Sequence, residues 1–100
     1  MNDITCQELK ERIDKGEALH IIDVREPYEF EEFNIGARLI PLGEIPGHLD
    51  ELSALKDEEI ILHCRSGARS NSAKLFLAEN GFTNVRNLIG GMMQWQTIID

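Results

Sequence analysis

Short apolar runs alternate with helical patterns along this chain, and that alternation limits its fold more than any other feature. The clearest run spans residues 59–63 (EIILH), where the apolar residues are consecutive and do not alternate with polar ones. Such a run is typical of a strand buried on both faces, as in a parallel sheet covered by helices. The other candidate strands occupy 20–24, 38–41 and 84–88. The pattern predicts an α/β domain with a parallel central sheet.

Helical patterns fill the segments between these runs. Thr5 is followed three residues later by Glu8, a pair that predicts a capping box at the start of the first helix, and Gly16 predicts its end. Pro27 suits the first turn of a short second helix. The remaining helical patterns cover 48–55, 70–80 and 92–98.

The composition is that of an ordinary folded domain. The chain has 100 residues, of which 42% are apolar and 28% charged, which predicts a single domain over residues 1–100. It contains no apolar run of roughly 18 residues, the length needed to cross a bilayer. Eighteen acidic residues against ten basic ones leave a net charge of −8. Nucleic acids and anionic membranes are therefore not expected as partners, because both are bound largely through Lys and Arg.

The first residues and the two cysteines indicate the compartment. Residues 1–4 have neither the basic nor the apolar stretch of an export signal, so we expect a cytoplasmic protein. Cys6 and Cys64 lie far apart in the sequence, and a reducing compartment keeps such cysteines as free thiols. There is no C-x-x-C pair and the histidines show no ligand spacing, so no metal ion is expected.

One segment combines a reactive side chain with an environment suited to anions. It lies between the run at 59–63 and the helix predicted at 70–80, and its residues are Cys64, Arg65, Ser66, Gly67, Ala68, Arg69 and Ser70. In parallel α/β folds, sites form at the carboxyl ends of the strands. The start of a helix offers unpaired N–H groups and the positive end of the helix dipole, and a curled loop turns further N–H groups inward.

These features are expected to favour the thiolate form of Cys64. Loop amides and the guanidinium groups of Arg65 and Arg69 stabilise a negative charge, which lowers the pKa of a thiol from its free value of about 8.5. The sequence leaves open which arginine points inward. Gly67 suits a tight loop because glycine tolerates positive φ. A lone cysteine at a strand end is typically buried and inert, but this combination favours a reactive site. Cys6 has acidic neighbours and no such loop, so we expect it to be structural.

Three segments resemble the rhodanese superfamily. Residues 63–70 (HCRSGARS) resemble its active-site loop of the C-R-S-G-x-R-S type. Residues 21–30 (IIDVREPYEF) are similar to its N-terminal D-V-R-E-x-x-E-[FY] signature, and residues 82–95 are similar to its C-terminal segment with L-x-G-G-x-x-x-W. The match covers nearly the whole chain in order. One departure is the segment 33–37 (FNIGA), which lacks the histidine and proline of the G-H-I-P-G-A motif found in many members.

The resemblance implies a three-layer α/β/α rhodanese-like fold with a central five-stranded parallel sheet. It also implies a sulfurtransferase, in which Cys64 takes sulfane sulfur from a small-molecule donor such as thiosulfate and holds it as a persulfide, without a cofactor. Arg69 lies five positions after Cys64, which is the C-x4-R spacing of the family's sulfurtransferases. The related phosphatases have C-x5-R and a wider loop.

The sequence also suggests the acceptor and leaves two other functions open. The chain's overall pattern, including residues 39–42 (LIPL), is similar to rhodanese domains of enzymes that adenylate sulfur-carrier proteins, which implies a thiol or sulfur-carrier protein as acceptor. One other function is a non-catalytic rhodanese-like binding module, which the intact cysteine and both arginines argue against. The other is phosphatase or arsenate-reducing activity, which the loop length disfavours.

Several nearby residues have simpler structural interpretations. Asp23 and Arg25 follow a predicted strand, and we expect them to brace the loops around the site, because persulfide chemistry needs no carboxylate for proton transfer. His63 is expected to be a buried histidine whose hydrogen bonds are satisfied, on the opposite side of the strand from its successor. Ser66 and Ser70 can donate hydroxyl hydrogen bonds to the sulfur, and capping of the next helix would by itself explain Ser70.

Overall fold

The computed structural model describes residues 3–99 and contains a four-stranded parallel sheet in the order β2-β1-β3-β4. The strands are β1 (Ile21–Asp23), β2 (Arg38–Leu39), β3 (Ile60–His63) and β4 (Val85–Asn87). Each strand falls inside one of the four segments predicted as strands from the sequence. All three strand pairs are parallel, so the predicted sheet type is confirmed.

The predicted count of five strands is wrong for the described residues, which form four. Beside β4, Ile4 is the only one of the residues 3–99 to add to the sheet, through a single parallel bridge to Leu88. The Ile4 amide donates to Asn87, and the Ile4 carbonyl accepts from Ile89. The pairing extends no further along the chain because Thr5 caps a helix that begins at the next residue.

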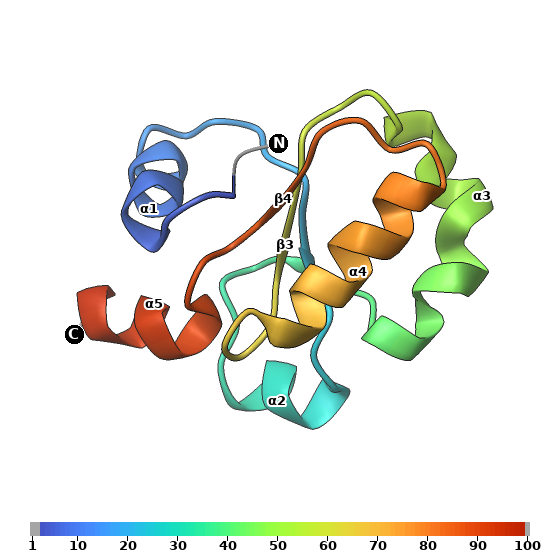
Figure 1. The fold of residues 1–100 in the computed structure, drawn as a ribbon. Coiled ribbons are helices and arrows are strands. Elements are labelled where there is room, and N and C mark those ends of the chain that lie inside the picture. Colours follow the sequence, from blue (N-terminus) through green and yellow to red (C-terminus); the bar gives the residue numbers. More distant parts are fainter. Residues whose placement is uncertain (1–2, 100) are drawn as a thin grey trace.

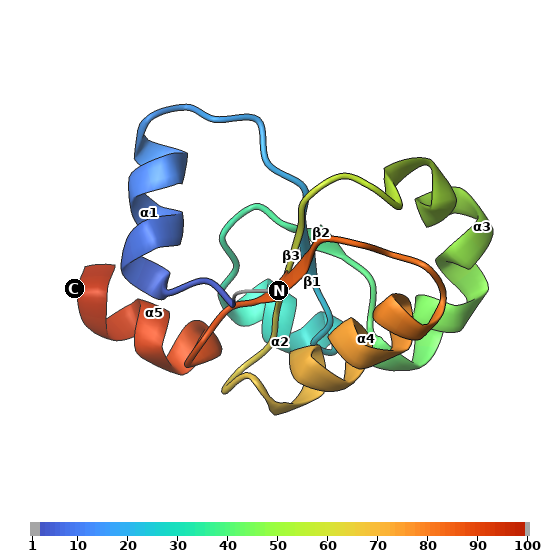
Figure 2. The ribbon, with the colours of Figure 1, turned by 45° about the horizontal axis from the view of Figure 1, so that its top comes forward.

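Helices cover both faces of the sheet and complete the three layers (Figures 1 and 2). In both views α1 and α5 lie on one side of the strands, α3 and α4 lie on the other, and α2 lies near one end of the sheet. Within residues 3–99, no helix is both long and apolar enough to span a bilayer. The α-helices are α1 (Cys6–Asp14), α2 (Pro27–Glu32), α3 (Leu49–Leu52), α4 (Ala68–Glu79) and α5 (Gly91–Ile99), and the 3₁₀ helices are η1 (Leu42–His48) and η2 (Ser53–Leu55).

Strand β3 supplies side chains to two separate apolar cores. Ile60 and Leu62 pack in the core that includes Leu77 of α4, whereas Ile61 packs in the core that includes Trp95 of α5. All three strand residues are completely buried. Full burial of each such side chain stabilises the fold by about 1.5–3 kcal/mol, which explains why this run is apolar on both faces.

Candidate active site

The loop that carries Cys64 is short because a strand ends directly before it and a helix begins directly after it. Strand β3 ends at His63, and α4 begins at Ala68 with Gly67 as its N-cap residue. Gly67 has φ +108°, a left-handed conformation that favours glycine. The helix therefore begins two residues before the predicted start at Ser70. Ser70 lies inside the first turn, so the expectation that it caps the helix is wrong.

Hydrogen-bond donors surround the sulfur of Cys64. The Gly67 amide lies 3.1 Å from Sγ, and the amide and hydroxyl of Ser70 lie 3.4 and 3.3 Å from it. Burial raises the pKa of the Cys64 thiol, but hydrogen bonds from the Ser70 hydroxyl and from the amides of Ser70, Gly67 and Ser66 outweigh that effect and lower the pKa. The side chain is only 1% exposed, so these groups replace most of its solvent.

The first turn of α5 holds the loop in place through backbone hydrogen bonds. The Met92 amide donates to the Cys64 carbonyl at 2.9 Å, and the Met93 amide donates to the Arg65 carbonyl at 2.9 Å. Gly91, which precedes them, has φ +54°, and a Cβ placed there would lie 2.5 Å from both loop carbonyl oxygens. Only a glycine allows this approach, which gives the paired glycines of the C-terminal segment a structural role.

Asn87, at the end of β4, connects both sides of the loop and was not predicted as a site residue. Its Nδ2 donates to the Gly67 carbonyl at 3.1 Å, and its Oδ1 accepts from the Ser70 hydroxyl. A hydroxyl has a single proton, so Ser70 can direct it to only one of three acceptors, which are Asn87, the Gly67 carbonyl and the sulfur of Cys64. The available signal in the sequence was an amide side chain near the carboxyl end of the candidate strand 84–88, where sites form in parallel α/β folds.

The two loop arginines have different surroundings. Arg69 forms a bidentate ion pair with Glu29 of α2, with N···O distances of 2.7 and 2.9 Å. The hydrogen bonds from Arg69 lower the pKa of Glu29 to about 2, so the carboxylate stays ionised at neutral pH. Arg65 is exposed and forms no ion pair with any residue in 3–99. Arg65 is therefore the loop arginine whose guanidinium is free to meet a ligand.

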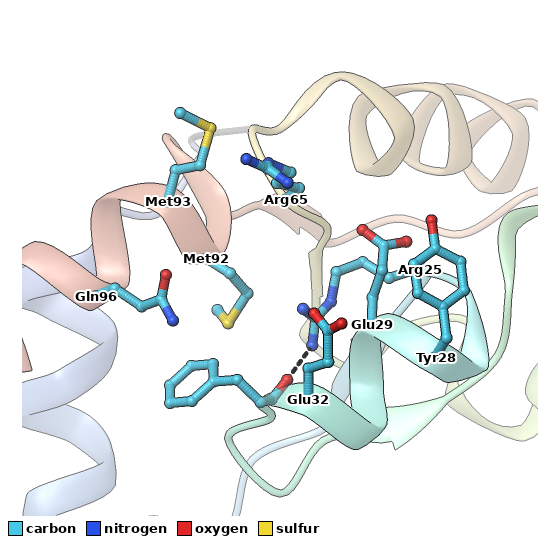
Figure 3. Close-up of a pocket in the computed structure, with 9 residues that line it drawn as sticks. Arg25, Tyr28, Glu29, Glu32, Arg65, Met92, Met93 and Gln96 are labelled. Carbon is cyan, nitrogen blue, oxygen red and sulfur yellow. Dashed lines mark hydrogen bonds between the residues drawn. The ribbon is translucent and has the colours of Figure 1, made fainter.

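Asp23 and Arg25 form a buried ion pair at the end of β1. The Arg25 Nε lies 3.0 and 3.1 Å from the two carboxylate oxygens of Asp23, and Nη2 lies 2.8 Å from Oδ2. The same Nη2 donates to the Phe33 carbonyl at 2.6 Å, a bond drawn in Figure 3. The pair thus ties the end of β1 to the segment after α2, which supports a bracing role.

His63 is buried without the hydrogen bonds expected for it. Neither ring nitrogen has a hydrogen-bond partner among the described residues, and the nearest carboxylate oxygen, on Asp23, is 3.9 Å from Nε2. Burial lowers the pKa of His63 to about 4, because the nearby Arg25 charge adds to it and the Asp23 carboxylate only partly opposes it. The ring is therefore neutral at physiological pH. In residues 3–99, no group of three His, Cys, Asp or Glu side chains could hold a metal ion.

A cavity of about 200 Å³ opens beside the loop. Figure 3 shows Arg65 on one side of the opening and Glu32, from the end of α2, on another. Met92 of α5 lies between them and forms part of the apolar wall. The cavity is lined by the residues that hold the loop from α2 and α5, so a molecule bound there would lie beside the segment that carries Cys64.

Comparisons with known proteins agree with this geometry. A family model for the rhodanese-like domain matches residues 5–98. The putative sulfurtransferase YtwF of Bacillus subtilis is 41% identical over 97 residues, which are 96% of this chain and 91% of YtwF. The putative sulfur carrier protein YrkF of the same organism is 38% identical over 94 residues, which are 93% of this chain but only half of YrkF.

A solved structure gives the same result for the fold. A rhodanese-like domain protein from Staphylococcus aureus superposes with a TM-score of 0.85 at 34% identity, and the match covers 95% of this chain and 91% of that one. The similarity to proteins named sulfurtransferases supports sulfur transfer as the general function. With 94 of its 100 positions matched by the family model, the chain belongs to the rhodanese-like domain family.

Proposed function

We propose that the protein transfers sulfane sulfur by double displacement through a persulfide on Cys64. The observation that carries this proposal is the set of donors around Sγ, from Gly67 and Ser70. Those donors favour the thiolate, which is the nucleophilic form of cysteine. The C-x4-R spacing between Cys64 and Arg69 and the relatives named sulfurtransferases support sulfur rather than phosphate as the transferred group.

The first half-reaction uses a donor such as thiosulfate. The Cys64 thiolate attacks the outer sulfur of thiosulfate, the S–S bond of the donor breaks, and sulfite leaves with the bonding electron pair. The product is the anion Cys64–S–S⁻. The amides of Ala68 and Arg69 belong to the first turn of α4 and have no acceptor within the helix, so they are available to the outer sulfur as in an oxyanion hole. Arg65, with its free guanidinium, orients the donor.

The second half-reaction returns Cys64 to its starting state. An acceptor thiol attacks the outer sulfur and Cys64 leaves as a thiolate. The acceptor is a small thiol or a sulfur-carrier protein, a suggestion that the name of the relative YrkF supports. We place the reaction in a reducing compartment, the cytoplasm, where Cys64 remains a free thiol between turnovers.

Mass spectrometry of the intact active-site peptide tests the proposal. The protein is incubated with thiosulfate, desalted and digested without reductant, and the peptides that contain Cys64 and Cys6 are compared. We expect one additional sulfur on the Cys64 peptide, which cyanide removes as thiocyanate, and none on the Cys6 peptide. An unmodified Cys64 peptide, or equal loading of both cysteines, contradicts the proposal.

A further inference from the structure

The charged groups that line the cavity beside the loop are not all neutralised. Arg25 is paired with Asp23, and Glu29 is paired with Arg69. Arg65 and Glu32 also line the cavity, but neither forms an ion pair with a described residue. Among the described residues, the cavity therefore presents one free cation and one free anion to a ligand.

The positions of these two charges restrict the ligand further. Arg65 belongs to the active-site loop and Glu32 to the end of α2, and Figure 3 shows them on different sides of the opening. The cavity volume of about 200 Å³ is below the 300–1,000 Å³ typical of drug-sized ligands, so the ligand is small. A dianion such as thiosulfate would meet one favourable and one unfavourable free charge. A small zwitterion would meet two favourable ones.

We propose that this cavity binds a small zwitterionic amino-acid thiol, of the cysteine type, as the sulfur acceptor. The α-carboxylate pairs with the Arg65 guanidinium, which is suited to bidentate contact with a carboxylate. The α-ammonium group pairs with the Glu32 carboxylate. This inference rests on the proposed function, because it names the acceptor for the persulfide on Cys64.

The cavity adjoins the backbone of the loop that carries the reacting group, although Cys64 itself does not line it. Arg65 is the residue after Cys64, and the amide of the cavity residue Met92 donates to the Cys64 carbonyl. The outer sulfur of a persulfide stands about 2 Å beyond Sγ, so the reacting atom extends further than the buried thiol. The acceptor sulfur bonds to this outer sulfur, and the bond from the outer sulfur to Sγ breaks. Cys64–S–S⁻ and R–SH thus give Cys64–S⁻ and R–S–SH, with the proton retained on the new persulfide.

Single-turnover transfer to three thiols tests the proposal. Protein loaded with sulfur from thiosulfate and then desalted is mixed with cysteine, with 3-mercaptopropionate, which lacks the ammonium group, or with cysteamine, which lacks the carboxylate. The rate constant for loss of the persulfide is divided by the concentration of acceptor thiolate. We expect cysteine to be about threefold to fivefold more efficient than either analogue, as for a partly exposed ion pair at each end. Equal constants for the three thiols overturn the inference.

Variants of α2 show whether Glu32 recognises the ammonium group. Glu32→Gln should abolish the advantage of cysteine over 3-mercaptopropionate and keep its advantage over cysteamine. Glu31→Gln is the matched control, because Glu31 is exposed on the same helix but does not line the cavity, and it should keep both advantages. Both positions are exposed, so neither change should unfold the protein, and Glu32→Lys should reverse the preference towards 3-mercaptopropionate. Identical discrimination in all three variants and the native chain contradicts the inference.

The loading step separates this inference from the function on which it rests. If Cys64 gains no sulfur from thiosulfate, the proposed function and the inference are both overturned. If Cys64 loads but transfers sulfur equally to the three thiols, only the assignment of the cavity fails.

Discussion

The two cysteines of this chain are both buried, yet their surroundings have opposite polarity. Cys6 is 3% exposed and Cys64 is 1% exposed, and they pack in the cores on opposite faces of the sheet. The sulfur of Cys6 lies 3.5 Å from the Ile89 carbonyl oxygen and 3.7 Å from that of Gly91. Both neighbours are acceptors, which suits a protonated thiol. The sulfur of Cys64 lies instead against N–H and O–H donors.

This difference shows that burial does not decide whether a cysteine is reactive. Burial raises the pKa of Cys6, and nothing in its surroundings reverses that effect. Burial also raises the pKa of Cys64, but there the hydrogen bonds more than compensate and the pKa is lowered. The direction of the pKa shift thus follows from whether donors or acceptors surround the sulfur.

Replacement of each cysteine by serine should give the largest difference between the two sites. Cys64→Ser removes the nucleophile, so the rate of thiocyanate formation from thiosulfate and cyanide should fall on the order of a thousandfold or more. Cys6→Ser should leave that rate unchanged, because its hydroxyl can donate to the same carbonyl groups as the thiol. A large loss of activity in Cys6→Ser, or a loss in Cys64→Ser much smaller than this, would contradict the assignment.

Gly91 contacts the surroundings of both cysteines, so we expect a substitution there to destabilise the fold strongly. Gly91 accepts from the Cys6 thiol, and its Cα packs against the carbonyl oxygens of Cys64 and Arg65. Gly91→Ala forces a Cβ into those oxygens at φ +54° and should lower the free energy of unfolding by about 2–4 kcal/mol. Gly43→Ala is the control in urea titrations, because no atom lies within 4 Å of its Cβ position. Equal losses in both variants would refute this account.

The buried histidine before Cys64 should add an acid-sensitive component to stability. His63 has a pKa of about 4 in the folded protein against 6.5 ordinarily, so the unfolded chain binds its proton first as the pH falls. Its contribution is complete above pH 6.5 and is lost between pH 6.5 and 4, up to about 3 kcal/mol. His63→Leu should flatten the pH dependence of the urea midpoint in that window, even though Asp23 and Arg25, the charged groups that face the ring, remain. An unchanged slope would contradict the burial of a neutral imidazole.

The smallest expected effect concerns the hydroxyl beside the sulfur. Ser70→Ala removes one donor, so the pKa of Cys64 should rise and its alkylation at neutral pH should slow by about threefold to tenfold. Ser72→Ala is the matched control on the same helix, since its hydroxyl contacts only the Ala68 carbonyl among the residues described. Stopped-flow alkylation of both variants gives the comparison, and equal rates would exclude the hydroxyl as a determinant of thiolate stability.

Local patterns predicted much of the fold. The consecutive apolar residues of β3 allow no polar face, so they predicted a buried parallel strand, and the structure confirms it. Thr5 was predicted to cap the first helix, and its hydroxyl accepts from the Glu8 amide at 3.1 Å. Both features depend on neighbours in sequence. The prediction of a fifth strand was wrong. The chain pairs beside β4 only until α1 begins, so Ile4 forms a single bridge to Leu88.

The partners within the site could not be predicted in the same way. The loop motif marked Cys64 and both arginines, but the pairing of Arg69 with Glu29 joins residues 40 positions apart. Asn87 reaches the loop only because β4 lies next to β3 in the sheet. A sequence shows which groups can donate or accept, whereas the tertiary fold decides which of them meet.

The pH dependence of alkylation at both cysteines, measured in one sample by peptide mapping, tests the central claim most directly. The Cys64 rate should reach its plateau with a midpoint below the ordinary thiol value of about 8.5, and the Cys6 rate should have a midpoint above it. A Cys64 midpoint equal to or higher than that of Cys6 would contradict the claim that the loop donors lower the pKa of this thiol.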